Sequence, residues 1–170
     1  MASEQNLNER AERITRADGI ASWRGHPLPA GPWHGEPDHL EFRSPEGIPC
    51  ILHRSSLGAW CGYVGVSPGH PWHGKDYGDI NEPYPDVHGG LTYAERCRGA
   101  VCHVARPGES DDVWWLGFDC NHSGDLSLYD VSEGRTDGIR FSSMESYKTI
   151  NYVREQALSL AAQAHAAGVA

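Results

Sequence analysis

The chain has 170 residues and a mass of 18.7 kDa, which is sufficient for one domain with a hydrophobic core. Its formal net charge of -9 argues against a nucleic-acid polymer as partner, since binding such a polymer requires Lys and Arg to neutralise its phosphates. A small anionic ligand remains possible, because a local pocket for it needs only a few cations. No apolar run approaches the roughly 20 residues that cross a bilayer, and the first residues lack the pattern of a signal peptide. We therefore expect a cytoplasmic protein that does not bind membranes.

The distribution of proline divides the sequence into an N-terminal arm and a main domain. A helix is predicted over residues 4–17, where a serine precedes the apolar positions and a glycine follows them. Residues 19–50 contain six prolines and leave little room for long elements. We predict a Pro/Gly-rich arm over residues 1–45 and a single domain over residues 46–170.

Alternation of side chains predicts an antiparallel sheet of about five strands. The clearest pattern is residues 59–66, in which Trp60, Val64 and Val66 share one face. The small residues on the other face indicate close approach of another segment. A glycine pair after His88 indicates a bulge or another close approach. The other predicted strands are residues 50–53, 87–93, 100–104 and 113–118.

The C-terminal segment has the clearest helical pattern in the chain. Ser142 and Glu145 form a capping box at its predicted start, and Gly168 follows its end. The acidic, glycine-containing residues 126–141 are predicted to form a surface loop. The expected fold class is α+β, an antiparallel sheet with the long C-terminal helix packed on one face. The apolar stripe of that helix consists of Ile150, Val153, Ala157, Leu160, Ala161 and Ala164.

Residues 113–125 combine a tryptophan-rich apolar strand with a loop of polar, ligand-forming side chains. A rigid strand that leads into such a loop is a common way of presenting a functional site. Imidazole and carboxylate groups at short spacing are the ligands of divalent ions that activate water. The predicted ligands of a divalent metal ion are His88, Asp119, His122 and Asp125, of which the last three are also the predicted catalytic residues.

Two other interpretations of the same loop need no metal. Asp119 and Asp125 can act as acid and base around His122. Alternatively the loop is structural: Asp119 caps a turn, Asp125 bonds to its own backbone in an Asx-turn, and His122 is an ordinary loop residue.

The five cysteines cannot all pair, so we expect free thiols or metal ligands in a reducing cytosol. A structural zinc site from Cys97, Cys102 and Cys120 with His103 or His122 is one alternative. Cys120 as a nucleophile activated by His122 is another.

The loop of residues 70–77 is a candidate lid over a ligand. Lys75 can meet a phosphate, and an aromatic side chain of this loop can stack on a base. The alternative is a surface loop ordered by proline, with its aromatic side chains packed on the sheet. Trp115 belongs either to the core or to a pocket wall. The predicted ligand-binding residues are Lys75, His73, Tyr63, Trp115 and Tyr93.

Several motifs carry a resemblance to a known group of proteins. His-Gly-Gly-Leu-Thr-Tyr at residues 88–93, Cys-His-Val at residues 102–104 and the stretch of residues 114–125 resemble a family of small proteins encoded by bacteriophages and prophages. The resemblance covers roughly residues 59–163. It implies a cytoplasmic protein of a phage-infected bacterium, in which accessory proteins of this size often act against host defences. No functional residues carry over from the family.

Two functions follow as hypotheses. The first is a small metal-dependent hydrolase that binds a nucleotide-like phosphorylated molecule. The second is a binding module without catalysis, either a nucleotide sponge or a protein inhibitor of a host defence component, because the sequence contains no P-loop, Gly-x-Ser-x-Gly or His-Glu-x-x-His signature. A homo-oligomer is compatible with both hypotheses.

Overall fold

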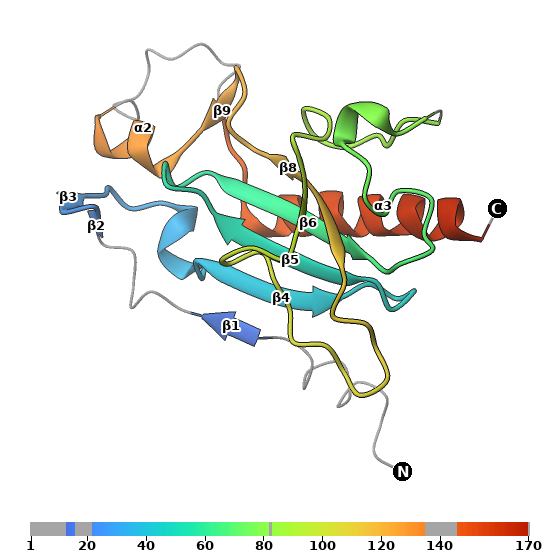
Figure 1. Ribbon diagram of the computed structural model, residues 1–170. Coiled ribbons are helices and arrows are strands. Elements are labelled where there is room, and N and C mark those ends of the chain that lie inside the picture. Colours follow the sequence, from blue (N-terminus) through green and yellow to red (C-terminus); the bar gives the residue numbers. More distant parts are fainter. Residues whose placement is uncertain (1–12, 16–21, 82, 135–145, 170) are drawn as a thin grey trace.

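The centre of the fold is an antiparallel sheet whose strands follow the order β1-β4-β5-β6-β8-β7 (Figure 1). The computed structural model describes residues 13–15, 22–81, 83–134 and 146–169. The prediction of an antiparallel sheet of about five strands is confirmed, and the short β1 extends the sheet beyond β4. The strands of the sheet are β1 (Arg13–Thr15), β4 (His39–Arg43), β5 (Pro49–Arg54), β6 (Trp60–Val66), β7 (Tyr93–Arg96) and β8 (Trp114–Asp119).

Shorter elements surround this sheet. Strands β2 and β3 form an antiparallel pair, and β9 and β10 form a parallel pair. The helix α2 begins with a capping box, in which Ser127 and Asp130 satisfy each other's backbone N–H groups. These elements are β2 (Ser22–Trp23), β3 (His26–Pro27), η1 (Pro32–Gly35), η2 (Tyr77–Asp79), β9 (Asp125–Leu126), α2 (Leu128–Ser132) and β10 (Ser146–Tyr147).

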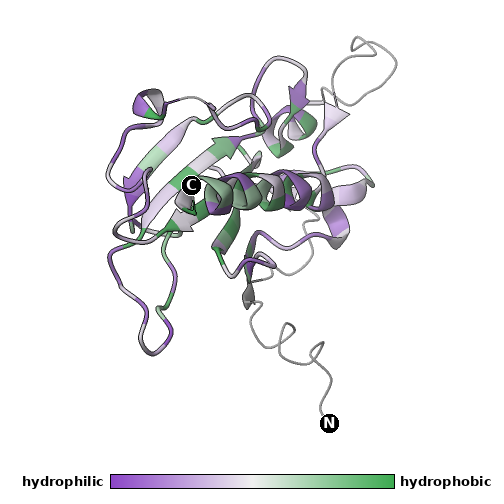
Figure 2. Cartoon of the chain, turned by 90° about the vertical axis from the view of Figure 1, so that its right-hand side faces the viewer, coloured by the Kyte–Doolittle hydropathy of each residue, from purple (hydrophilic) through white to green (hydrophobic). Residues whose placement is uncertain are grey.

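The C-terminal helix α3 (Ile150–Gly168) lies along one face of the sheet, as predicted (Figures 1 and 2). Thr149 caps its N-terminus by accepting a hydrogen bond from the N–H of Tyr152. Three of its five buried residues are alanines, whose small side chains allow the helix backbone to approach the sheet closely. Among the described residues, no helix has the length and apolar character needed to cross a membrane.

The two faces of the sheet belong to different clusters of buried residues. Leu116 and Phe118 of β8 pack with α3 in the main core. Trp115 and Ile51 lie on the opposite face, where they pack with Val101 from the connection between β7 and β8. The alternation predicted for residues 59–66 and 113–118 is therefore confirmed.

A buried carboxylate joins the N-terminal arm to the sheet and to α3. Glu36 accepts hydrogen bonds from the guanidinium of Arg54 at 2.7 Å, from the indole N–H of Trp60 at 3.0 Å and from the backbone N–H of Ile150 at 2.8 Å. The Tyr147 hydroxyl also donates to Glu36. Since buried charges are retained where they are paired and hydrogen-bonded, this network fixes the arm on the main fold.

Several predicted elements differ in the structure. Residues 87–92 form a turn and an irregular segment instead of a strand, because Gly89 and Gly90 have φ angles of 67° and 82°. Residues 100–104 contribute only an isolated bridge at Val101. Residues 128–132 of the predicted loop form a helix, and the strand β4 lies within the region that was expected to be irregular.

Two predictions fall mostly on residues outside the described part of the chain. Of the helix predicted over residues 4–17, only residues 13–15 are described, and they form a strand. The capping box of Ser142 and Glu145 lies outside the described residues, and α3 begins later, at Ile150.

Two of the five cysteines contradict the expectation of free thiols or metal ligands, and the other three are free as expected. Cys97 and Cys102 form a disulfide, so the proposed zinc set is wrong. Cys50, Cys61 and Cys120 are free and buried. Burial raises the pKa of the Cys120 thiol far above its ordinary value, which disfavours the nucleophilic thiolate and the Cys120–His122 alternative.

Candidate metal centre

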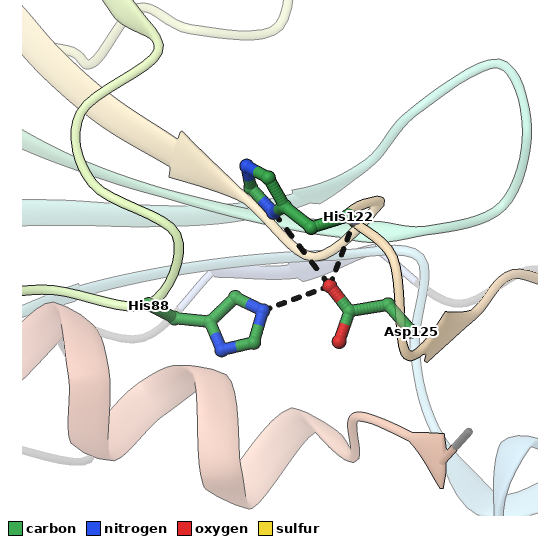
Figure 3. Close-up of side chains that lie close together, drawn as sticks. All are labelled: His88, His122 and Asp125. Carbon is green, nitrogen blue, oxygen red and sulfur yellow. Dashed lines mark hydrogen bonds and ion pairs between the residues drawn. The ribbon is translucent and has the colours of Figure 1, made fainter. Parts of the chain in front are cut away.

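Three of the four predicted metal ligands lie together beside the N-terminal part of α3 (Figure 3). His88 belongs to the loop that precedes β7, His122 to the turn that follows β8, and Asp125 is the first residue of β9. One ligand atom from each residue lies within 4.8 Å of the other two. The juxtaposition joins segments that are more than 30 residues apart in the sequence.

The turn after β8 orients two of these side chains toward the same point. The N–H of Asp125 donates to the carbonyl of His122 at 2.9 Å, and Asp125 Oδ2 accepts from the N–H of His122 at 3.0 Å. Gly124 has a φ of 96°, which a residue with a side chain rarely adopts. The Asx-turn predicted at Asp125 is not what the structure shows, because its carboxylate accepts from an N–H three residues earlier in the chain and also faces both imidazoles.

The glycine pair that follows His88 allows the backbone of its loop to lie directly against the His122 ring. A β-carbon added to Gly89 would lie 2.6 Å from Nδ1 and from Nε2 of His122 and closer still to Cε1, whereas Gly90 has open space around it. The close approach predicted beside His88 is confirmed. The N–H of His88 donates to Oε1 of Gln156 at 2.9 Å, so α3 holds the loop in place.

The distances in the cluster suit a small divalent ion. Two ligands of a tetrahedral ion with bonds of about 2.1 Å lie roughly 3.4 Å apart. His88 Nε2 is 2.8 Å from Asp125 Oδ2, and His122 Nδ1 is 3.7 Å from the same oxygen. These two separations bracket the required value. A set of two histidines and one carboxylate with further positions open is typical of catalytic sites for divalent metals.

A second layer of contacts supports the candidate ligands. His88 Nδ1 lies 2.9 Å from the hydroxyl of Tyr152, an arrangement that leaves Nε2 for the metal when Nδ1 carries the proton. Lys148 Nζ lies 3.6 Å from Asp125 Oδ1, and the Asp125 side chain is only 3% exposed. Burial raises the pKa of Tyr152, so its hydroxyl stays protonated at neutral pH.

Asp119, the fourth predicted ligand, lies beside this group and not within it. Its Oδ2 accepts a hydrogen bond from the Thr92 hydroxyl at 2.8 Å, and its Oδ1 accepts from the N–H of Asn121 at 3.0 Å. The second bond is the turn cap that the structural interpretation predicted. Asp119 Oδ1 is 3.8 Å from His122 Nδ1, and Asp125 Oδ2 is 3.7 Å from the same nitrogen, so both carboxylates approach one atom of that imidazole.

A hollow of about 310 Å³ adjoins Asp119. Tyr63 and Tyr93, two of the predicted ligand-binding residues, line it. Their rings meet edge to face with centroids 5.1 Å apart. Among the described residues that line the hollow there is one carboxylate and no lysine or arginine. The remaining lining residues are Ser55, Ser56, Leu57, Cys61, Thr92, Phe118 and Asn121.

The other predicted ligand-binding residues lie elsewhere. Lys75 and His73 are at the opposite end of β8, where the Lys75 carbonyl accepts from the Trp114 indole and His73 Nε2 lies 3.1 Å from the Asp112 carbonyl. Trp72 of this loop packs in the main core, as the alternative interpretation of a surface loop expected, whereas Tyr77 is exposed. Trp115 has an exposed fraction of 0%, so it is a core residue and cannot stack on a ligand.

Reasoning from the sequence did not identify Lys148, Tyr152 or Gln156. The last two are one helical turn apart on α3, so they reach the same segment of the loop. The helix carries other polar side chains, among them Arg154, Glu155 and Gln163, so this spacing alone does not single out the pair. Lys148 reaches Asp125 because β10 pairs in parallel with β9, and no pattern in the sequence predicts this pairing.

The fold and the cluster define an α+β protein with a candidate site for a divalent metal ion. Comparison of the chain with protein-family models, with curated proteins and with solved structures found no match.

Proposed function

We propose that the protein is a metal-dependent hydrolase that acts on a nucleotide-like phosphorylated small molecule. The observation that supports this proposal most strongly is the convergence of His88, His122 and Asp125 within 4.8 Å. A divalent ion held there supplies a Lewis acid and lowers the pKa of a bound water. The three residues would hold the ion and would leave room for water and substrate on it.

The surroundings assign distinct tasks to the chain's own residues. Tyr152 and Gln156 orient His88 from α3, and the turn N–H of His122 orients Asp125. Lys148, beside Asp125, supplies the cation for a phosphate oxygen in place of the distant Lys75. Because Lys148 lies beside a candidate metal ligand, the phosphate would bind next to the ion.

Replacing His122 by Ala tests the proposal. The His122 side chain is 35% exposed, so its removal leaves the core intact and lowers the melting temperature little. We expect the variant to lose binding of Mn²⁺ or Zn²⁺ and hydrolysis of every substrate that the wild-type protein turns over in a panel of nucleoside phosphates. His26→Ala, at an exposed position in the distant β3, is the matched control. Equal turnover in the wild-type protein and His122→Ala contradicts the proposal.

A specific observation also favours the second function, a binding module without catalysis. The direct bond of 2.8 Å between His88 and Asp125, together with Lys148, holds the cluster together without an ion. A module of this kind returns its ligand unaltered. Calorimetry followed by mass spectrometry of the released ligand separates the two functions, because the hydrolase releases a product and the sponge releases the nucleotide.

The cellular role is a further part of the proposal. The resemblance to phage-encoded proteins supports action in the cytoplasm of an infected bacterium, where hydrolysis or capture of a nucleotide signal would counteract host defence. Expression of the gene in bacteria that carry nucleotide-signalling defences, with His122→Ala as control, tests this role by phage plating efficiency.

A further inference from the structure

The hollow beside Asp119 has a composition that differs from that of a phosphate site. Its described lining offers hydroxyl groups, an amide and a carboxylate but no cation. An anionic group placed there would meet the charge of Asp119 without compensation. The lining therefore suits the uncharged, hydroxyl-bearing part of a ligand. Its volume, about 310 Å³, is at the small end of the roughly 300–1,000 Å³ of small-molecule sites.

Asp119 is fixed in position while it retains acceptor capacity. Thr92 and the N–H of Asn121 each occupy one lone-pair site, and an ionised carboxylate has about four such sites. The side chain is 32% exposed, so the remaining sites are open to a ligand. Two neighbouring hydroxyl groups on one ring are donors that match the two oxygens of a carboxylate.

The tyrosines form an aromatic wall next to this carboxylate. The ring of Tyr63 packs on the backbone of β8 at Gly117, where an added β-carbon would lie 2.8 Å from Cε1 of the ring. Tyr93 closes the wall edge to face. Burial raises the pKa of both phenols, which therefore stay neutral at physiological pH. A flat ring can pack on such a wall without any charge on the ligand.

Asp119 links the hollow to the candidate metal centre. Asp119 lines the hollow, and its Oδ1 lies 3.8 Å from His122 Nδ1. We propose that the hollow is a subsite for a ring with neighbouring hydroxyl groups, with Asp119 as the acceptor of those hydroxyls and not as a metal ligand. This inference rests on the proposed function, in which the phosphate lies at the metal and the ring is the ribose of a nucleoside.

The test uses the full-length protein treated with EDTA, so that binding in the hollow is measured apart from the metal. Adenosine, 2′,3′-dideoxyadenosine and methyl glucoside are titrated by calorimetry. We expect saturable binding of adenosine and at least roughly tenfold weaker binding of the dideoxy analogue, because the charged carboxylate of Asp119 loses two hydrogen-bond donors. Asp119→Asn should weaken adenosine binding by a similar factor. Asp112→Asn, an exposed carboxylate at the other end of β8, should leave binding unchanged.

The outcomes separate this inference from the proposed function. Adenosine and its dideoxy analogue binding equally well, or wild-type affinity in Asp119→Asn, overturns the subsite. Absence of saturable binding for both adenosine and methyl glucoside also overturns it. Binding of methyl glucoside in preference to adenosine, with the same dependence on Asp119, supports the subsite and assigns the ring to a pyranose. Metal titration of Asp119→Asn should give the wild-type affinity, since a loss would make Asp119 a ligand. If the wild-type protein binds adenosine but no metal, the proposed function fails and the subsite stands.

Discussion

Replacing Gly89 by Ala should damage the metal centre without direct removal of any ligand. The β-carbon would lie 2.6 Å from two ring atoms of His122, so the imidazole must move. The φ of 67° is also unfavourable for alanine, so the free energy of unfolding of the variant should fall by about 1 kcal/mol. Displacement of one ligand should weaken metal binding by roughly 10- to 100-fold, the range found when support of a ligand is lost. Competition with a fluorescent chelator measures this change.

Gly90→Ala is the matched control for this experiment. Gly90 has a φ of 82°, so the backbone cost is similar, but nothing lies within 4 Å of its added β-carbon. We expect similar losses of unfolding free energy in both variants and wild-type metal affinity in Gly90→Ala alone. Equal metal affinity in the two variants would refute the reasoning that His122 is a ligand at this position.

Three further predictions concern support, burial and pH. Tyr152→Phe should weaken metal binding by roughly 10- to 100-fold with an unchanged circular dichroism spectrum, since it removes a partner of a ligating imidazole; unchanged affinity would contradict this role. Glu36→Gln should lower the free energy of unfolding in urea by about 3 kcal/mol. This is the low end for a broken buried ion pair, because Asp38 still contacts Arg54. A loss below about 1 kcal/mol would contradict the role of this pair in stability. Burial raises the pKa of Cys50 from 9.0 to about 12, so the thiol ionises first in the unfolded chain and the free energy of unfolding should fall as pH rises above 9. Cys50→Ala should reduce the slope of unfolding free energy against pH in this range. An identical slope in the variant would contradict burial of Cys50 as its cause.

The sequence predicts those parts of the fold that depend on local patterns. The alternation of β6 and β8 and the apolar stripe of α3 are properties of short windows, and the structure confirms them. The strand predicted over residues 87–93 fails because two consecutive positive φ angles at Gly89 and Gly90 end any extended pairing. The glycine pair correctly predicted that another segment approaches the backbone beside His88, but it did not predict that this segment carries His122.

Contacts between distant segments could not be predicted in this way. The placement of Lys75 depends on how its loop packs against the start of β8, and no periodicity encodes this packing. The disulfide between Cys97 and Cys102 is local, with the two residues five positions apart, but it depends on the turn between them, and the odd number of cysteines suggested free thiols instead. Asp119 is the last residue of β8, and the Thr92 hydroxyl on the neighbouring segment holds one of its carboxylate oxygens, a contact that no local pattern predicts.

The central claim is that His88, His122 and Asp125 bind one divalent ion. The most direct measurement is native mass spectrometry of the metal-loaded protein, combined with X-ray absorption at the metal edge. The account predicts one ion per chain with two imidazole ligands, and loss of that ion in both His88→Ala and His122→Ala. A wild-type protein that binds no ion, or single variants that retain it with full affinity, would contradict the account.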